Sequence, residues 1–224
     1  MLRLIILILR YLSSMEWNKL HEEIIYETVT SLLDAEQQQL SKIHRNQLKD
    51  GFLSSLGENS LNLLFSFAAS SDSGLLIVAK SKTSNVIIGF LLATTNTTSF
   101  YKEFLRKNLF KALWIVLPKL FSISRIVKLM ETLMYPLKHE LVEYPIAELL
   151  DIAISREYQG HGIATDLFHL MVNNFRLLSI NKFKITTGEI LKGAQHFYTK
   201  LGAVQIDTIQ VHKGENTIVY EYNI

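Results

Sequence analysis

The stretch that decides the fold is Ile146–Phe175, which reads IAELLDIAIS REYQGHGIA TDLFHLMVNNF. Its first segment, Ala147–Ile154, is short, apolar and bounded by polar residues, which predicts a strand buried on both faces. The last segment carries apolar residues at the spacing of one helix face, namely Ile163, Leu167, Leu170, Met171, Phe175 and Leu178. Between them, Gly160 and Gly162 allow a tight turn. A strand, a glycine turn and a helix start predict a site for a phosphate or pyrophosphate, because the first helical N–H groups lack partners inside the helix.

Two other kinds of phosphate-binding loop do not match this stretch. A dinucleotide-binding fingerprint needs a third glycine and an acidic residue about 20 positions further on, where the chain has Lys182 and Lys184. A P-loop needs a Gly-Lys-Ser/Thr sequence, which is absent here. A glycine turn that binds no ligand remains the alternative interpretation.

The turn resembles a loop of the GNAT acyltransferase superfamily. Its residues Gln159-x-x-Gly162-x-Ala164 match the family's Q/R-x-x-G-x-G/A pattern, and Ala194–Ala203 (AQHFYTKLGA) is similar to the family's A-x-x-F-Y-x-x-x-G-F/A segment. The chain departs from the family at Leu191, where asparagine is common, and at Ser155, where proline often follows the strand. The match covers roughly residues 146–204, and about residues 22–95 agree only in pattern.

This resemblance implies that the chain binds acetyl-coenzyme A (acetyl-CoA) as a cosubstrate. Backbone N–H groups from Gly160 to Thr165 would hold the pyrophosphate. Main-chain groups of Ile152 and Ile154 would bind the pantetheine arm, and one N–H there would stabilise the thioester oxyanion. The implied coenzyme-binding residues are Ile152, Ala153, Ile154, Gln159, Gly160, His161, Gly162, Ile163, Ala164 and Thr165.

Glu148 is the first candidate for a general base. It lies six residues before Ile154, where GNAT proteins of the histone-acetylating type carry a catalytic glutamate. A carboxylate in an apolar strand should have a raised pKa, which suits a base near neutral pH. Strict alternation would place four residues on one strand face: Glu148, Leu150, Ile152 and Ile154. The alternatives are a structural hydrogen bond or salt bridge of Glu148, a base at Asp151 or Glu189, and a water relay.

Tyr198 matches the family tyrosine that protonates the sulfur of the coenzyme, which a phenol can do. The alternative for Tyr198 is packing, because it belongs to a helical stripe made of Ala194, Phe197, Tyr198 and Leu201. The seven histidines show no spacing or carboxylate pairing that indicates a metal, so we assign none. Without cysteine, a thioester intermediate on the enzyme is impossible, and direct transfer is the expected route.

The expected fold is α/β and GNAT-type: a mixed, mainly antiparallel central sheet flanked by helices, with an α-helical insertion before the central strand. Asp34 and Gln37 predict a capping box at the start of a helix. The expected strands are 23–30, 75–79, 86–93, 147–154, 183–187, 204–210 and 217–222. The expected helical regions are 34–48, 52–70, the insertion at 97–145, 163–178 and 191–201.

The insertion is basic. Residues 99–136 hold seven Lys or Arg and two Glu, a charge of +5 in a chain whose net charge is +2. A helical hairpin with solvated lysines is one interpretation. A surface that builds the acceptor pocket, or makes a peripheral membrane contact through 99–136, is the other, because basic amphipathic helices suit anionic surfaces.

The composition fits one globular domain, residues 21–224, after an N-terminal extension of residues 1–20. The apolar run Leu4–Leu9 is too short to span a membrane. It could form an added strand or a short surface anchor, or the true start could be Met15, which is the preferred interpretation. A cytoplasmic protein is expected, possible homodimerisation is left open, and the small net charge predicts no nucleic-acid partner.

The predicted activity is transfer of an acetyl group from acetyl-CoA to a primary amine of a small molecule, an amino sugar or a protein. The alternative is a non-catalytic acyl-CoA-binding module whose basic insertion docks a partner or a membrane surface.

Overall fold

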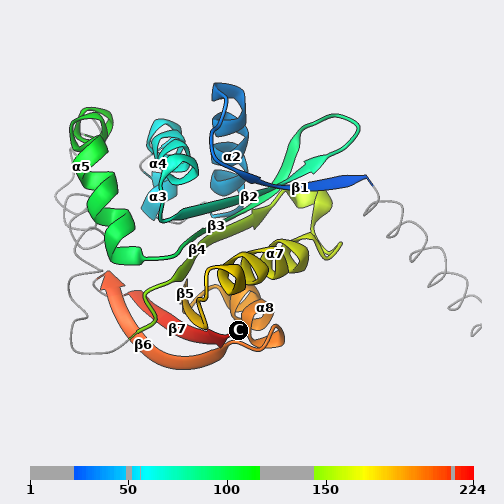
Figure 1. Ribbon diagram of the computed structural model, residues 1–224, viewed down its shortest axis with the longest axis vertical. Helices are drawn as coiled ribbons and strands as arrows, with labels where there is room; N and C mark the ends of the chain where they lie inside the picture. The colour runs from blue at the N-terminus through cyan, green and yellow to red at the C-terminus, as the bar shows by residue number, and fades with distance from the viewer. Residues whose placement is uncertain (1–22, 49–51, 56, 117–143, 213–214) are drawn as a thin grey trace, which may run out of the picture.

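A seven-stranded sheet runs through the protein in the order β1-β2-β3-β4-β5-β7-β6 (Figure 1). The computed structural model describes residues 23–48, 52–55, 57–116, 144–212 and 215–224. Adjacent strands are antiparallel except β4 and β5, which are parallel. Helices cover both faces of the sheet. The predicted fold class, a mixed and mainly antiparallel sheet flanked by helices, is confirmed.

The described strands are β1 (Ile24–Val29), β2 (Gly74–Ser81), β3 (Ile87–Thr94), β4 (Glu148–Ile154), β5 (Lys182–Gly188), β6 (Val204–His212) and β7 (Glu215–Asn223). The described helices are α2 (Asp34–Gln47), α3 (Phe52–Ser55), α4 (Glu58–Ser70), α5 (Thr97–Val116), the 3-10 turn η2 (Arg156–Tyr158), α7 (Ile163–Leu177) and α8 (Lys192–Lys200).

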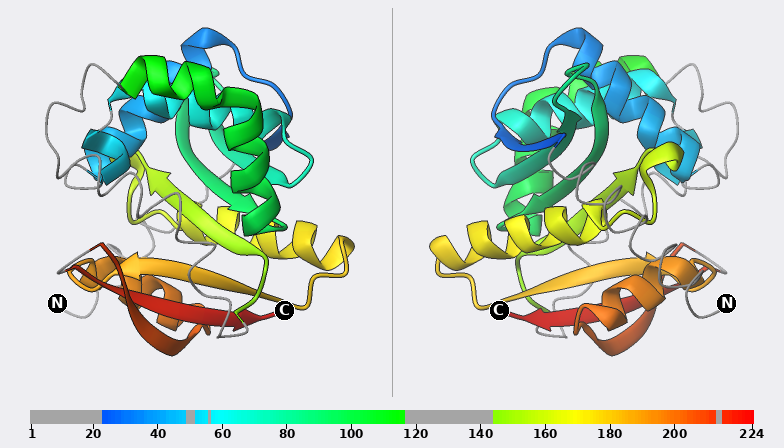
Figure 2. Two further views of the ribbon diagram at one scale, coloured as in Figure 1. Left: turned by 90° about the vertical axis from the view of Figure 1, so that its left-hand side faces the viewer. Right: turned by 90° about the vertical axis from the view of Figure 1, so that its right-hand side faces the viewer.

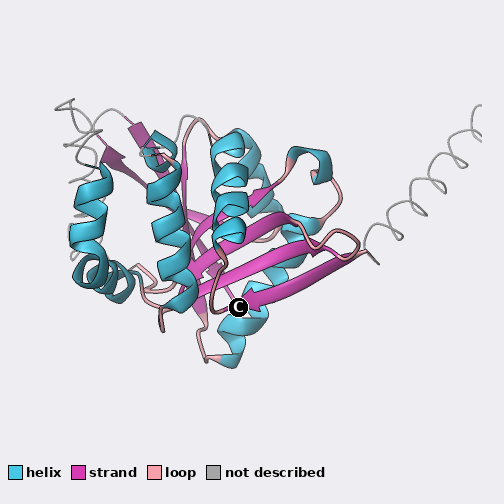
Figure 3. Ribbon diagram, turned by 90° about the horizontal axis from the view of Figure 1, so that it is seen from above, coloured by secondary structure: helices cyan, strands magenta, loops and turns pink. Residues whose placement is uncertain are grey.

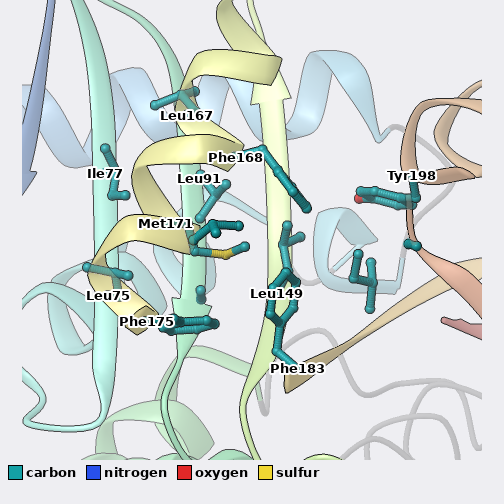
Figure 4. Packing of buried hydrophobic residues seen from close by; sticks show 14 of the residues in the cluster. Leu75, Ile77, Leu91, Leu149, Leu167, Phe168, Met171, Phe175, Phe183 and Tyr198 are labelled. Atoms are coloured by element: carbon teal, nitrogen blue, oxygen red, sulfur yellow. The ribbon is translucent and has the colours of Figure 1, made fainter. Parts of the chain in front are cut away.

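Helix α7 covers one face of the sheet because its predicted apolar stripe is buried there. Leu167, Phe168, Met171 and Phe175 are all fully buried against strands β2 to β4 and β5 (Figure 4). Phe168 lies edge-on to the rings of Phe197 and Tyr222 and close to Phe183. This aromatic group joins α7 to α8 and to both β5 and β7.

The opposite face is covered by α2, α4 and α5, which pack through a second apolar cluster (Figures 2 and 3). Phe65 of α4 meets Phe90 of β3 with ring centroids 4.9 Å apart. Phe100 at the start of α5 packs edge-on against Phe67 of α4. The two clusters meet at β4, where Leu149 belongs to one and Ala153 to the other.

The predicted capping box of α2 is wrong by one residue. Leu33 is the N-cap, and its backbone N–H donates to the Glu36 carboxylate at 3.0 Å. Gln37 instead donates to the Leu32 carbonyl. The predicted helical region up to Ser70 is also interrupted, because Gly57 adopts φ 85° and starts a new helix.

The predicted alternation along β4 is wrong, because the strand contains a β-bulge. Leu92 faces Asp151 and Ala93 faces Leu149, so Leu150 is the extra residue. Leu150 therefore packs with the α4 cluster, whereas Ile152 and Ile154 belong to the α7 side. The bulge changes which side chains of β4 share a face.

The first helix of the predicted insertion is present as α5, which begins at Thr97. The predicted second helix lies outside the described residues, so the bounds 97–145 stay a prediction, as do the N-terminal extension and the candidate start at Met15. Among the helices that the structure describes, none has the length and apolar character needed to cross a membrane.

Replacing Phe168 by alanine is expected to lower the free energy of unfolding by about 3–5 kcal/mol, because it removes a fully buried ring and leaves a cavity among aromatic neighbours. Urea denaturation followed by circular dichroism measures this. The next residue, His169, is exposed, and His169→Ala is the matched control with an expected change within about 0.5 kcal/mol. Equal stability of the two variants would contradict this account of the core.

Candidate active site

The candidate site lies where β4 and β5 separate. The two strands pair only at Glu148 with Lys184 and at Leu149 with Ile185. Beyond these pairs the structure has a cavity of about 820 Å³ between β4, the start of α7, the end of β5, and α8. Because β4 and β5 are not hydrogen-bonded beyond these pairs, the main chain of β4 borders an open space. Such a space suits an extended ligand.

One end of the cavity is the predicted anion-binding turn. Gly160 and Gly162 both have φ 80°, and Gly162 is the left-handed N-cap of α7. The first intrahelical bond is donated by Asp166 to the Gly162 carbonyl at 3.0 Å. The preceding N–H groups of Ile163, Ala164 and Thr165 thus have no acceptor inside the helix. All three residues line the cavity, so the turn presents N–H donors to a ligand there.

The turn is tied to the rest of the fold by two side chains. Gln159 donates to the Ile154 carbonyl at 3.0 Å and to Gln47 of α2 at 2.8 Å. Asp166, in the first turn of α7, accepts a hydrogen bond of 2.6 Å from the hydroxyl of Tyr26 in β1. Burial, and then this contact with Asp166, raise the pKa of the Tyr26 phenol far above its usual value.

The wall of the cavity includes Ile152, Ala153 and Ile154. The resemblance implies that these residues bind the coenzyme, and this role stays a prediction. The N–H of Ser155 donates to Ile88 of β3. Alternation therefore turns the main-chain groups of Ile154 and Ile152 away from β3 and toward the cavity. Of the ten predicted coenzyme-binding residues, His161 alone is absent from the lining.

Tyr198 of α8 also lines the cavity and is 6% exposed. Its hydroxyl points toward β4 (Figure 4). Burial, and then the charge of Asp151, raise the pKa of the Tyr198 phenol well above its usual value. The phenol is therefore protonated at neutral pH and has a proton to donate.

Glu148 is 2% exposed and is not among the residues that line the cavity. Its carboxylate accepts hydrogen bonds of 3.0 Å from the hydroxyls of Thr97 and Thr186, and the Lys184 ammonium lies 3.5 Å away. Its charge also acts on α5, where burial and then Glu148 raise the pKa of Tyr101. The contacts fit a structural role as well as a catalytic one, so its role as base stays a prediction.

A pair that sequence reasoning missed is His44 with Asp151. The imidazole Nδ1 of His44, on α2, lies 2.6 Å from a carboxylate oxygen of Asp151 on β4. One signal was readable: His44 shares its helix face with Leu40 and Ile43, so burial of a polar ring was predictable. Its partner, 107 residues away, was not.

No group of three or more potential metal ligands (His, Cys, Asp or Glu) occurs among the residues that the structure describes. The cavity itself presents main-chain N–H groups, the phenol of Tyr198 and the carboxylate of Asp151.

Comparison with known proteins identifies the family. The family model described as the acetyltransferase (GNAT) family matches residues 39–203. The match covers most of the chain, and the protein belongs to the GNAT acetyltransferase family. A search of curated proteins by sequence found no match.

Solved structures show the same fold at low identity. A protein from Desulfovibrio desulfuricans that is assigned to the GNAT family of acetyltransferases is 12% identical with a TM-score of 0.57, over 89% of this chain and 98% of that one. NAA60 from Arabidopsis thaliana, solved with a bisubstrate analogue, is 14% identical with a TM-score of 0.53, over 90% and 98%. The NatC complex bound to Gag peptide and CoA is 12% identical with a TM-score of 0.52, over 90% and 99%.

Replacing Gly162 by glutamate is expected to weaken coenzyme A binding by about 10²-fold or more, because it adds a side chain and a negative charge at the N-cap of α7. Isothermal titration calorimetry measures this. Asn173→Glu is the matched control, since it adds the same charge at an exposed position later in α7. A folded Gly162→Glu protein with the affinity of the control would contradict the assignment of the turn.

Proposed function

We propose that this protein transfers the acetyl group of acetyl-CoA to a primary amine by direct attack. The observation that carries the proposal is the single cavity that joins the anion-binding turn at α7 to the buried, protonated Tyr198. A pyrophosphate at the turn would direct the rest of the coenzyme along β4, toward Tyr198. Two structural neighbours support this choice of cosubstrate, because NAA60 was solved with acetyl-CoA and the NatC complex with CoA.

In this proposal, β4 binds the pantetheine arm through the main chain of Ile154 and Ile152. Both residues lack a partner in β5, because pairing between β4 and β5 stops at Leu149. An added strand-like ligand would restore these hydrogen bonds. The N–H of Ile152, just after the bulge, would then stabilise the thioester oxygen as negative charge develops.

Chemistry at the thioester follows from direct attack. The amine nitrogen forms a bond to the carbonyl carbon, the C–S bond breaks, and Tyr198 gives its proton to the departing thiolate. The amine must also lose protons. For the base, the sequence-based proposal is Glu148, which would act through water since it does not line the cavity. The chain has no cysteine to carry the acetyl group, so direct transfer needs no group beyond these.

The acceptor is proposed to be an amine of a small molecule, an amino sugar or a protein. A peptide is bound in the NatC structure, and NAA60 is bound to a bisubstrate analogue, which supports a protein or peptide amine. A role of the insertion in binding the acceptor or a membrane surface also stays a proposal. On α5, Phe110 and Trp114 are 86% and 82% exposed beside Lys107 and Lys111, which fits such a surface.

Tyr198→Phe is expected to lower turnover by about 10²-fold or more with little change in coenzyme affinity, because the ring stays packed and only the proton donor is lost. Steady-state release of coenzyme A, measured over a panel of amines, gives turnover. Phe197→Tyr is a control that adds a hydroxyl to the neighbouring ring and leaves Tyr198 in place. Wild-type turnover in Tyr198→Phe would assign this residue to the core alone.

A further inference from the structure

The cavity is lined by one negative side chain. Among the residues that line the cavity, Asp151 is the only carboxylate, and Lys200, on the exposed surface of α8, is the only cationic side chain. The predicted anion-binding turn follows the end of the same strand, β4, and also lines the cavity. The cavity therefore combines N–H donors suited to phosphates with a carboxylate suited to a cation.

The β-bulge is what brings Asp151 to this position. Leu150 is the extra residue of β4. Because of this extra residue, the side chain of Asp151 lies on the sheet face that α2 covers. There the Asp151 side chain, 10% exposed, meets the His44 imidazole, 4% exposed, at 2.6 Å. This short contact fixes one carboxylate oxygen, Oδ2. In the part of the chain that the structure describes, Oδ1 has no hydrogen-bond partner, so it is available to a ligand.

Of the two ring nitrogens of His44, only Nδ1 has a hydrogen-bond partner in the described part of the chain, which is Asp151. The second ring nitrogen, Nε2, is buried and has no hydrogen-bond partner among the described residues. The ring lies edge-on to Phe65, with centroids 6.3 Å apart, on the apolar α4 side. With Nδ1 as the donor, the ring holds the Asp151 carboxylate from the α2 side.

Asp151 and Tyr198 both line the cavity, and the Asp151 charge is near enough to contribute to the raised pKa of the Tyr198 phenol. An acceptor nitrogen beside Asp151 would thus be near the phenol that we assign to the leaving thiolate. Glu148 lies on the same strand, but its carboxylate is engaged by Thr97, Thr186 and Lys184.

We propose that Asp151 is the catalytic residue that binds the ammonium group of the acceptor and takes its proton, and that His44 is a positioning residue that holds Asp151 for this step. The inference rests on the proposed function and names its acceptor as a cationic primary amine. It assigns to Asp151 the step for which Glu148 is the sequence-based candidate.

The protons balance in this scheme. The ammonium gives one proton to Asp151, and the free amine lone pair forms the N–C bond. The C–S bond breaks, and the thiolate sulfur takes a proton from Tyr198. As the amide forms, the nitrogen loses its second proton, which returns Tyr198 to its protonated state. The proton on Asp151 leaves to solvent, and the products are an acetamide and coenzyme A.

The first test uses Asp151→Asn in the full chain, with an amine on which wild type is active. We expect kcat/KM for that amine to fall by about 10²-fold or more, and coenzyme A affinity to stay within about 3-fold, since the anion-binding turn is unchanged. Glu157→Gln is the matched carboxylate control, because Glu157 is exposed and is not among the residues that line the cavity, and its expected kcat/KM is that of wild type. A loss in Asp151→Asn no larger than the loss in this control overturns the inference.

A second acceptor distinguishes a catalytic role of Asp151 from a structural one. Hydroxylamine is a neutral nucleophile at neutral pH, so it needs no base to become reactive, and Asp151→Asn should lose much less activity with it than with the cationic amine. Rates are corrected for the reaction without enzyme. Equal losses with both acceptors would mean that Asp151 only supports the fold.

His44 is tested with two side chains of equal shape. His44→Asn keeps an N–H donor near the position of Nδ1, and His44→Leu removes it. We expect His44→Asn to stay within about 10-fold of wild type and His44→Leu to approach the loss of Asp151→Asn. Equal activity of the two overturns the positioning role. If Asp151→Asn does not fold, as shown by the loss of its native melting transition, the comparison of His44→Asn with His44→Leu still tests the inference. A wild type inactive on every amine would instead overturn the proposed function itself.

Discussion

The site depends on the separation of β4 from β5 after Leu149. In a continuous sheet, the main-chain groups of β4 would be paired on both sides, and no ligand could reach them. Here pairing stops after two residues, so the later part of β4 keeps its hydrogen bonds to β3 and offers its other edge to the cavity. Beyond Leu149, the backbone hydrogen bonds between β4 and β5 are absent, and a bound ligand can replace them.

The same strand sets the polarity of the cavity. The bulge at Leu150 turns Asp151 toward α2, while the end of β4 leads into the glycine turn and the start of α7. A negative side chain and a set of N–H donors thus line one space of about 820 Å³. Under the proposed function, the N–H donors would hold the coenzyme phosphates and the carboxylate would hold the cationic amine, so the two substrates could react without a covalent intermediate.

The sequence was sufficient where the features are local. The strand, turn and helix of Ile146–Phe175 follow from periodicity and two glycines, and the structure has all three. The features that it could not predict depend on distant partners. The bulge of β4 is defined only against β3, and the partners of Glu148 come from α5 and β5. His44 and Asp151 meet because α2 lies over β4, which no spacing along the chain encodes.

The hydrogen bond from Tyr26 to Asp166 links residues 140 positions apart in the chain. During synthesis, β1 leaves the ribosome long before α7, so its Tyr26 hydroxyl must remain hydrated until the helix exists. Strand β1 can pair with β2 early, because β2 follows after helices α2, α3 and α4, well before α7. Its attachment to α7 comes only when most of the chain has been made. The start of α7, next to the predicted anion-binding turn, thus forms its hydrogen bond to β1 late in synthesis.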